Sequence, residues 1–139
     1  MPATTRLAEA IFALSKRSWI ETSRQTAELT EPEFFALDHL VEAGTATVGQ
    51  IQRQIGVLPA QMSRHLRRLR SAGFVTCQIN RDDRRKVNVA ITQSGGAVHA
   101  KYRRAKLAPI IAALERLTEH ERSQFMGLVQ KMAATESYG

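Results

Sequence analysis

The sequence contains a single cysteine, Cys77, among its 139 residues. One cysteine excludes an internal disulfide framework and any zinc site built from several cysteines. No stretch approaches the roughly 18 consecutive apolar residues that a membrane-spanning helix requires. The first residues include neither an apolar signal core nor a small-residue cleavage site. We therefore expect a soluble cytoplasmic protein without a membrane partner.

Signatures of catalysis and of metal binding are also missing. The sequence has no glycine-rich phosphate loop, no G-x-S-x-G nucleophile elbow and no pair of carboxylates placed for acid–base chemistry. The four histidines are scattered, with no i, i+4 pair and no carboxylate-rich motif beside them. We expect neither an enzyme nor a bound cofactor or metal.

Positive charge is abundant and concentrated. The formal net charge is +7, and six of these seven charges lie between Leu58 and Lys86, where eight cations face only two carboxylates. The eight cations are Arg64, Arg67, Arg68, Arg70, Arg81, Arg84, Arg85 and Lys86. Such a patch focuses a positive potential on one face, and its natural partner is a polyanion. Nucleic acid is favoured over an anionic membrane surface, because the apolar residues are expected to pack in a core and not to contact lipid.

With 43% apolar residues and no linker or repeat, residues 1–139 are expected to form one domain. Six helices are predicted from helical periodicity, from three capping boxes that begin with threonine, and from glycines at helix ends. Two strands are predicted where β-branched residues alternate with polar or small ones. The predicted helices cover about 4–27, 30–44, 47–56 and 59–72, with a long helix from residue 93 and a last helix from residue 118. The predicted strands cover 74–79 and 87–91. Pro109 is expected to kink or break the long helix.

This order predicts a mainly α fold with a small β-hairpin wing, a winged helix-turn-helix over residues 30–92. The flanking segments 4–27 and 93–135 carry more apolar positions than such a lobe can cover. A two-fold dimer would bury the excess, so we interpret these segments as dimerisation helices.

The helix over 59–72 has two opposite faces. At 100° per residue, Met62, Leu66 and Leu69 fall within a narrow arc and are expected to pack inward. Polar and small residues fall on the other side and its edges, where arginine and glutamine read base edges in the major groove of DNA. The candidate major-groove residues are Ala60, Gln61, Ser63, Arg64, Arg67 and Arg68. Leu58, at the cap position, offers no side-chain acceptor.

The segment between the two strands is a basic hairpin tip. An arginine on such a protruding loop can enter a narrow minor groove, and a neighbouring carboxylate can hold it extended. The alternative is a flexible charged turn with no specific role. The candidate wing residues are Arg81, Asp83, Arg84, Arg85 and Lys86.

At this point the residues resemble a known family. Asp83-Arg84-Arg85, followed by Val87 to Thr92 and then Gly95, is similar to the wing signature of MarR-type regulators. The stretch from Thr47 to Val75 is similar to the helix-turn-helix of that family. The resemblance implies a homodimer on a pseudo-palindromic double-stranded DNA operator, with Arg85 in the minor groove, Asp83 orienting it and Arg84 on phosphate. It also implies a small-molecule effector for many members, without fixing one here.

Three further residues have two interpretations each. Cys77 is either an inert strand residue or a redox sensor, since some relatives in this family sense peroxide through one thiol. Trp19 and Tyr102 either belong to the core or line an effector pocket. The sequence thus favours a ligand-responsive, DNA-binding repressor. The alternatives are a winged-helix module for protein interaction or RNA binding, and a redox-sensing regulator that uses Cys77.

Overall fold

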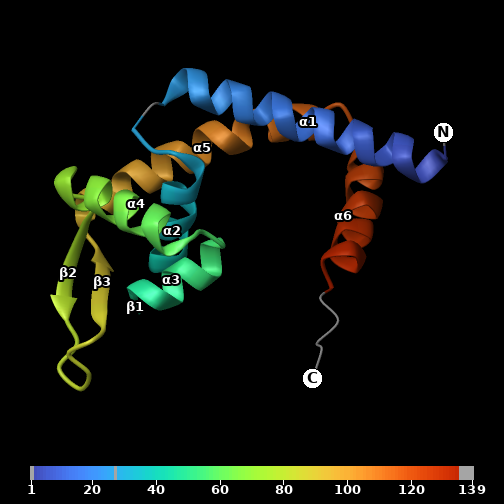
Figure 1. Ribbon diagram of the computed structural model, residues 1–139. Helices are drawn as coiled ribbons and strands as arrows, with labels where there is room; N and C mark the ends of the chain where they lie inside the picture. Colours follow the sequence, from blue (N-terminus) through green and yellow to red (C-terminus); the bar gives the residue numbers. More distant parts are fainter. Residues whose placement is uncertain (1, 27, 135–139) are drawn as a thin grey trace. The chain divides into compact units, whose positions relative to one another are not determined.

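The computed structural model describes residues 2–26 and 28–134, which form two compact units (Figure 1). Residues 2–21 and 106–134 make up the terminal unit, and residues 22–105, apart from residue 27, make up the central unit. Two long helices, α1 (Ala3–Gln25) and α5 (Gln93–Leu114), contribute to both units. The last residue of the helix predicted over 4–27 and residue 135 of the segment 93–135 lie outside the described residues.

The terminal unit is entirely helical. It contains most of α1, the second half of α5 and α6 (Glu119–Ala133). A capping box begins α6, because Thr118 Oγ1 accepts a hydrogen bond from Glu121 N (3.1 Å) and Glu121 Oε1 accepts one from Thr118 N (2.9 Å). These bonds lower the pKa of Glu121. None of the described helices is long and apolar enough to cross a membrane.

The expected break at Pro109 does not occur, since α5 continues as one helix to Leu114. Proline removes one i→i−4 hydrogen bond, and the bonds of the neighbouring turns suffice to carry the helix past it.

The central unit packs helices against a small antiparallel sheet. Its helices are α2 (Glu31–Ala43), α3 (Val48–Ile55), α4 (Pro59–Ser71) and the first half of α5. Its strands are β1 (Thr45–Thr47), β2 (Val75–Ile79) and β3 (Val87–Ile91), in the spatial order β1-β3-β2. The mainly α winged helix-turn-helix fold is confirmed. Sequence reasoning missed β1, because three residues are too few to show strand alternation.

Apolar side chains from all these elements form the core of the central unit. Leu37, Ile51, Met62, Leu69 and Val89 are each at most 2% exposed. Two apolar residues of α2 lie partly in solvent: Phe35 is 42% exposed and Val41 50%. Phe35 projects about 100° away from its buried neighbour Phe34, and Val41 falls in the last turn of the helix.

Aromatic stacking attaches α5 to α2 within this unit. The Phe34 ring stacks on both His99 (4.9 Å between centroids) and Tyr102 (4.6 Å). The buried His99 ring places Nε2 2.8 Å from Asp38 Oδ1, so its polar edge has a partner. Burial and, to a smaller extent, Glu31 raise the pKa of Tyr102.

Thr92 and Gly95 fix the junction between the sheet and α5. Thr92 Oγ1 donates to Gly73 O (2.6 Å) and accepts from Gly95 N (3.0 Å). A Cβ atom on Gly95 would overlap the carbonyl oxygen of Phe74. The Thr-x-x-Gly part of the wing signature therefore has a structural role, because it lets α5 begin close against the turn between α4 and β2.

Candidate DNA-binding surface

The helix α4 presents its polar face because its apolar residues are anchored in the core. Met62 and Leu69 are 1% and 2% exposed, and Leu66 packs against the same core as a partly buried residue. The candidate major-groove residues Ala60, Gln61, Ser63, Arg64, Arg67 and Arg68 are all exposed. The structure therefore brings these six together on one solvent-facing side of α4.

Gln61, a candidate major-groove residue, also caps the start of α4. Leu58 has no side-chain acceptor, but Gln61 Oε1 accepts a hydrogen bond from Leu58 N at 3.0 Å. Half of a capping box is thus present, and Pro59 occupies the first turn. This bond uses one of the two lone pairs of the Gln61 amide oxygen. The spacing Leu58-x-x-Gln61 was a signal for this role that sequence reasoning overlooked.

Arg68 is also engaged within the protein. Its Nη1 atom lies 3.2 Å from Oε2 of Glu33, whose side chain is 1% exposed. His65 Nδ1 lies 3.3 Å from the same oxygen. Glu33 also belongs to the capping box that begins α2, and the sequence pattern gives no sign of its contact with α4.

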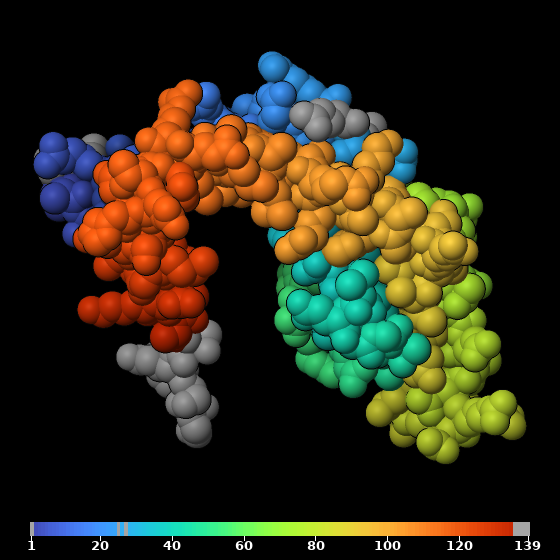
Figure 2. Space-filling view, turned by 180° about the vertical axis from the view of Figure 1, so that it is seen from behind, coloured from blue at the N-terminus to red at the C-terminus, as the bar shows by residue number. Residues whose placement is uncertain are grey.

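The wing tip between β2 and β3 is a hydrogen-bonded turn. Asn80 Oδ1 accepts hydrogen bonds from the backbone N–H groups of Asp82 (2.9 Å) and Asp83 (3.0 Å). The backbone bond from Asn80 N to Lys86 O, at 2.9 Å, closes the loop. The tip extends away from the helices of the central unit (Figures 1 and 2).

Asp83 and Arg85 form a bidentate pair on this tip. Arg85 donates from Nε to Asp83 Oδ1 (3.1 Å), from Nη2 to Oδ2 (3.3 Å) and from its backbone N to Oδ1 (3.1 Å). These bonds hold the pKa of Asp83 below its usual value. The Arg85 side chain is nevertheless 90% exposed, so it is held in one pose while remaining accessible.

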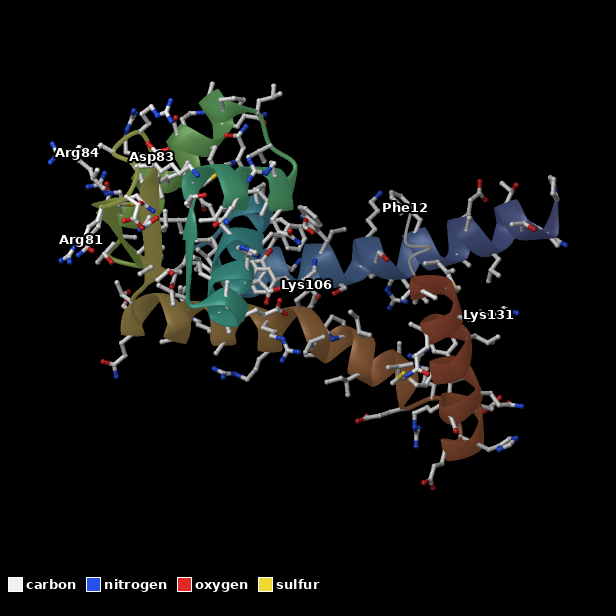
Figure 3. The ribbon with its side chains drawn as sticks, turned by 90° about the horizontal axis from the view of Figure 1, so that it is seen from below. Phe12, Arg81, Asp83, Arg84, Lys106 and Lys131 are labelled. Atoms are coloured by element: carbon white, nitrogen blue, oxygen red, sulfur yellow. The ribbon has the colours of Figure 1, made fainter. Side chains whose placement is uncertain are left out.

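The other wing cations project into solvent. Arg81, Arg84 and Lys86 are exposed, and Arg81 and Arg84 point outward from the tip in different directions (Figure 3). Because α4 packs against β2, the wing and α4 belong to the same compact unit. The surface therefore carries two sets of accessible arginines, one on a helix and one on a protruding loop.

The remaining candidates lie apart from this surface. Cys77 is half-buried in β2, and burial raises the pKa of its thiol despite the opposing effect of Arg70. Tyr102 is 6% exposed and belongs to the core, as one of its two interpretations had it. Trp19 is 47% exposed in the terminal unit, with Lys106 Nζ 5.0 Å from the centroid of its ring. The effector pocket stays a prediction.

Comparisons with known proteins agree with this geometry. Residues 29–87 match the model of the MarR family. The HTH-type transcriptional regulator YwhA of Bacillus subtilis is 26% identical over 127 residues, which cover 87% of this chain and 90% of YwhA. A MarR family protein from Bacillus stearothermophilus has a TM-score of 0.80 at 20% identity, over 93% of this chain and 89% of that one.

A third similar protein is BpsR of Bordetella bronchiseptica, whose DNA binding is regulated by 6-hydroxynicotinic acid. Its TM-score is 0.73 at 18% identity, over 98% of this chain and 99% of BpsR.

Proposed function

We propose that this chain is a MarR-type transcriptional regulator and acts as a homodimeric, ligand-responsive repressor, because residues 29–87 match the model of the MarR family. Each protomer places α4 in the major groove of a double-stranded DNA half-site and its wing tip in the adjacent minor groove. The chain has no enzymatic role and acts in the cytoplasm. The proposed operator is pseudo-palindromic, because two-fold symmetry in the protein requires two related half-sites.

The observation that carries this proposal is the division of α4 into a buried and a basic face. Met62 and Leu69 anchor the helix, while Arg64 and Arg67 stand exposed on the other side. An α-helix fits the major groove, and arginine forms paired hydrogen bonds with guanine O6 and N7. On the wing, the arginine of the Asp83–Arg85 pair is 90% exposed, and an accessible arginine suits a narrow minor groove.

The apolar surface of the terminal unit supports the dimer. Phe12 and Leu7 of α1 are 70% and 62% exposed, and Met132 and Leu128 of α6 are 73% and 58% exposed. Exposed apolar residues at this density on packed helices usually mark an association surface. A second copy of the chain would cover them, which is the arrangement expected for the dimerisation helices.

Ligand response is proposed by analogy with BpsR, whose DNA binding responds to a small aromatic acid. Trp19, which is 47% exposed, is the proposed effector contact, whereas Tyr102 packs in the core. Redox sensing through Cys77 is less favoured, because a raised thiol pKa lowers the fraction of reactive thiolate. A role in protein binding is less favoured too, because a protein-docking wing has no need of four cations at its tip. RNA binding stays an alternative that the titration below tests.

The proposal is tested with residues 1–139 in three steps. Binding to random duplex DNA, followed by fluorescence anisotropy over a range of salt concentrations, establishes whether the protein binds DNA. Selection of binding sites from fragmented genomic DNA then identifies an operator. A repeat of the titration on RNA of the same sequence separates the alternatives. Equal or tighter binding to RNA would contradict the proposed function.

A further inference from the structure

Resting on the proposed DNA-binding function, we infer that Glu33 is a positioning residue that withholds Arg68 from the DNA backbone. The phosphate-binding charge of α4 then comes from Arg67 and not from Arg68. The helical projection places Arg68 at the edge of the polar face, and the structure shows that Glu33 lies beside it there.

Glu33 bridges α2 and α4 through both of its carboxylate oxygens. Oε1 accepts the hydrogen bond from Thr30 N at 2.9 Å, which fixes the side chain at the start of α2. Oε2 then faces α4, where it lies 3.3 Å from His65 Nδ1 and 3.2 Å from Arg68 Nη1. The carboxylate is 1% exposed, so its charge depends on these partners instead of on water.

This burial makes the contact with Arg68 persistent. An ionised carboxylate removed from water is strongly disfavoured unless it is paired and hydrogen-bonded. His65 supplies one of the partners on α4, but Arg68 is the one that is permanently charged. Releasing Arg68 to a phosphate would leave His65 as the remaining partner of Glu33 Oε2 on α4, and that loss opposes the gain from the phosphate contact.

Arg68 would otherwise be free to reach DNA. Its side chain is 56% exposed, and an open cleft of about 430 Å³ lies beside it. Glu33, Arg67 and Phe74 are among the residues that line this cleft. Steric confinement therefore does not hold the guanidinium in place, whereas the charge of Glu33 does. In contrast, Arg67 has no ion-pair partner among the described residues.

The salt dependence of DNA binding distinguishes a withheld arginine from an available one. Each phosphate neutralised by the protein releases counterions and adds about 0.9 to the magnitude of the slope of log K against log salt concentration. Removing the charge of Glu33 should therefore steepen the slope, because Arg68 becomes available to phosphate. A purely structural role for Glu33 would lower affinity or stability without adding a phosphate contact.

The experiment measures this slope on random duplex DNA for the unchanged protein, Glu33→Gln, Arg68→Ala and the double variant. We expect Glu33→Gln to steepen the slope by about 0.9 per protomer, and the added Arg68→Ala to remove that increment. Arg68→Ala alone should reduce the slope by less than it does in the Glu33→Gln background. Arg67→Ala, the matched control, should reduce the slope equally in both backgrounds.

Equal effects of Arg68→Ala in both backgrounds would overturn the inference, because Arg68 would then contact phosphate whether or not Glu33 is charged. If circular dichroism shows that Glu33→Gln does not fold, the deciding comparison is Arg68→Ala against Arg67→Ala in the otherwise unchanged protein. A smaller loss of slope for Arg68→Ala supports the inference, and an equal loss overturns it. Absence of DNA binding by the unchanged protein would overturn the proposed function as well, so the two failures are distinguishable.

Discussion

Arg64 provides the sharpest test of the proposed readout. It lies in the first half of α4, on the side opposite the buried Met62, and it is exposed. Arg64→Ala removes no core contact, and alanine is at least as good a helix former as arginine, so the fold and its stability should not change. Loss of a paired hydrogen bond to a base should cost about 1–3 kcal/mol per half-site.

In a dimer the loss occurs twice, so affinity for the full operator should fall by about 2–6 kcal/mol. This corresponds to a factor between about 30 and more than about 10⁴. Affinity for random duplex should fall much less, because only electrostatic contacts contribute there. The assay is fluorescence anisotropy at fixed salt concentration, on a selected operator and on random duplex, with circular dichroism to verify folding.

The matched control is Arg70→Ala, an equal loss of charge from another exposed position on the same helix. This variant should leave the ratio of operator affinity to random-duplex affinity unchanged. If Arg64→Ala weakens binding to operator and random duplex by the same factor, Arg64 contacts only phosphate and the assignment of base readout to it is wrong.

Three further predictions concern the wing, the dimer and the thiol. Arg85→Ala should remove any preference for A·T-rich operator flanks, whereas Arg84→Ala should lower affinity equally on every flank. If both variants lose affinity equally on every flank, the wing contributes only electrostatic attraction. Sedimentation at micromolar concentration should give a dimer, and Phe12→Glu should shift it to a folded monomer; a monomeric unchanged protein that binds its operator would contradict the dimer. Because burial raises the pKa of Cys77, its thiolate forms only at higher pH than an ordinary thiol. Alkylation by iodoacetamide at pH 8 should therefore be slower in the folded than in the urea-unfolded chain, and the opposite order would revive the redox interpretation.

Local signals in the sequence were sufficient to predict most helix ends. Each capping box needs only a threonine and a glutamate or glutamine three residues later, so those begun by Thr30, Thr47 and Thr118 could be found and are present. The Asp83–Arg85 contact was also predictable, because the two residues are neighbours on a short loop. The role of Arg85 in DNA binding stays a prediction.

Tertiary contacts were beyond the sequence pattern. Glu33 and His65 are 32 positions apart, and no periodicity links a carboxylate on one helix to a basic residue on another. A helical projection gives the direction of Arg68 from the axis of α4 but not what lies beside it. The strand β1 was missed for a similar reason, since its pairing with β3 joins Ala46 to Val89 across more than 40 positions.

The location of Glu33 also reduces the electrostatic repulsion among the arginines of α4. The 13 residues of α4 include four arginines and no acidic residue, so pairs such as Arg64 and Arg67 or Arg64 and Arg68 repel one another along the helix. Each like-charged pair at this spacing costs about 0.2–0.5 kcal/mol. A carboxylate on α4 itself would relieve the repulsion, but on the exposed face it would also repel the phosphates of DNA. A carboxylate on α2, buried against the edge of α4, stabilises the helix from the side and leaves the face with Arg64 and Arg67 wholly positive.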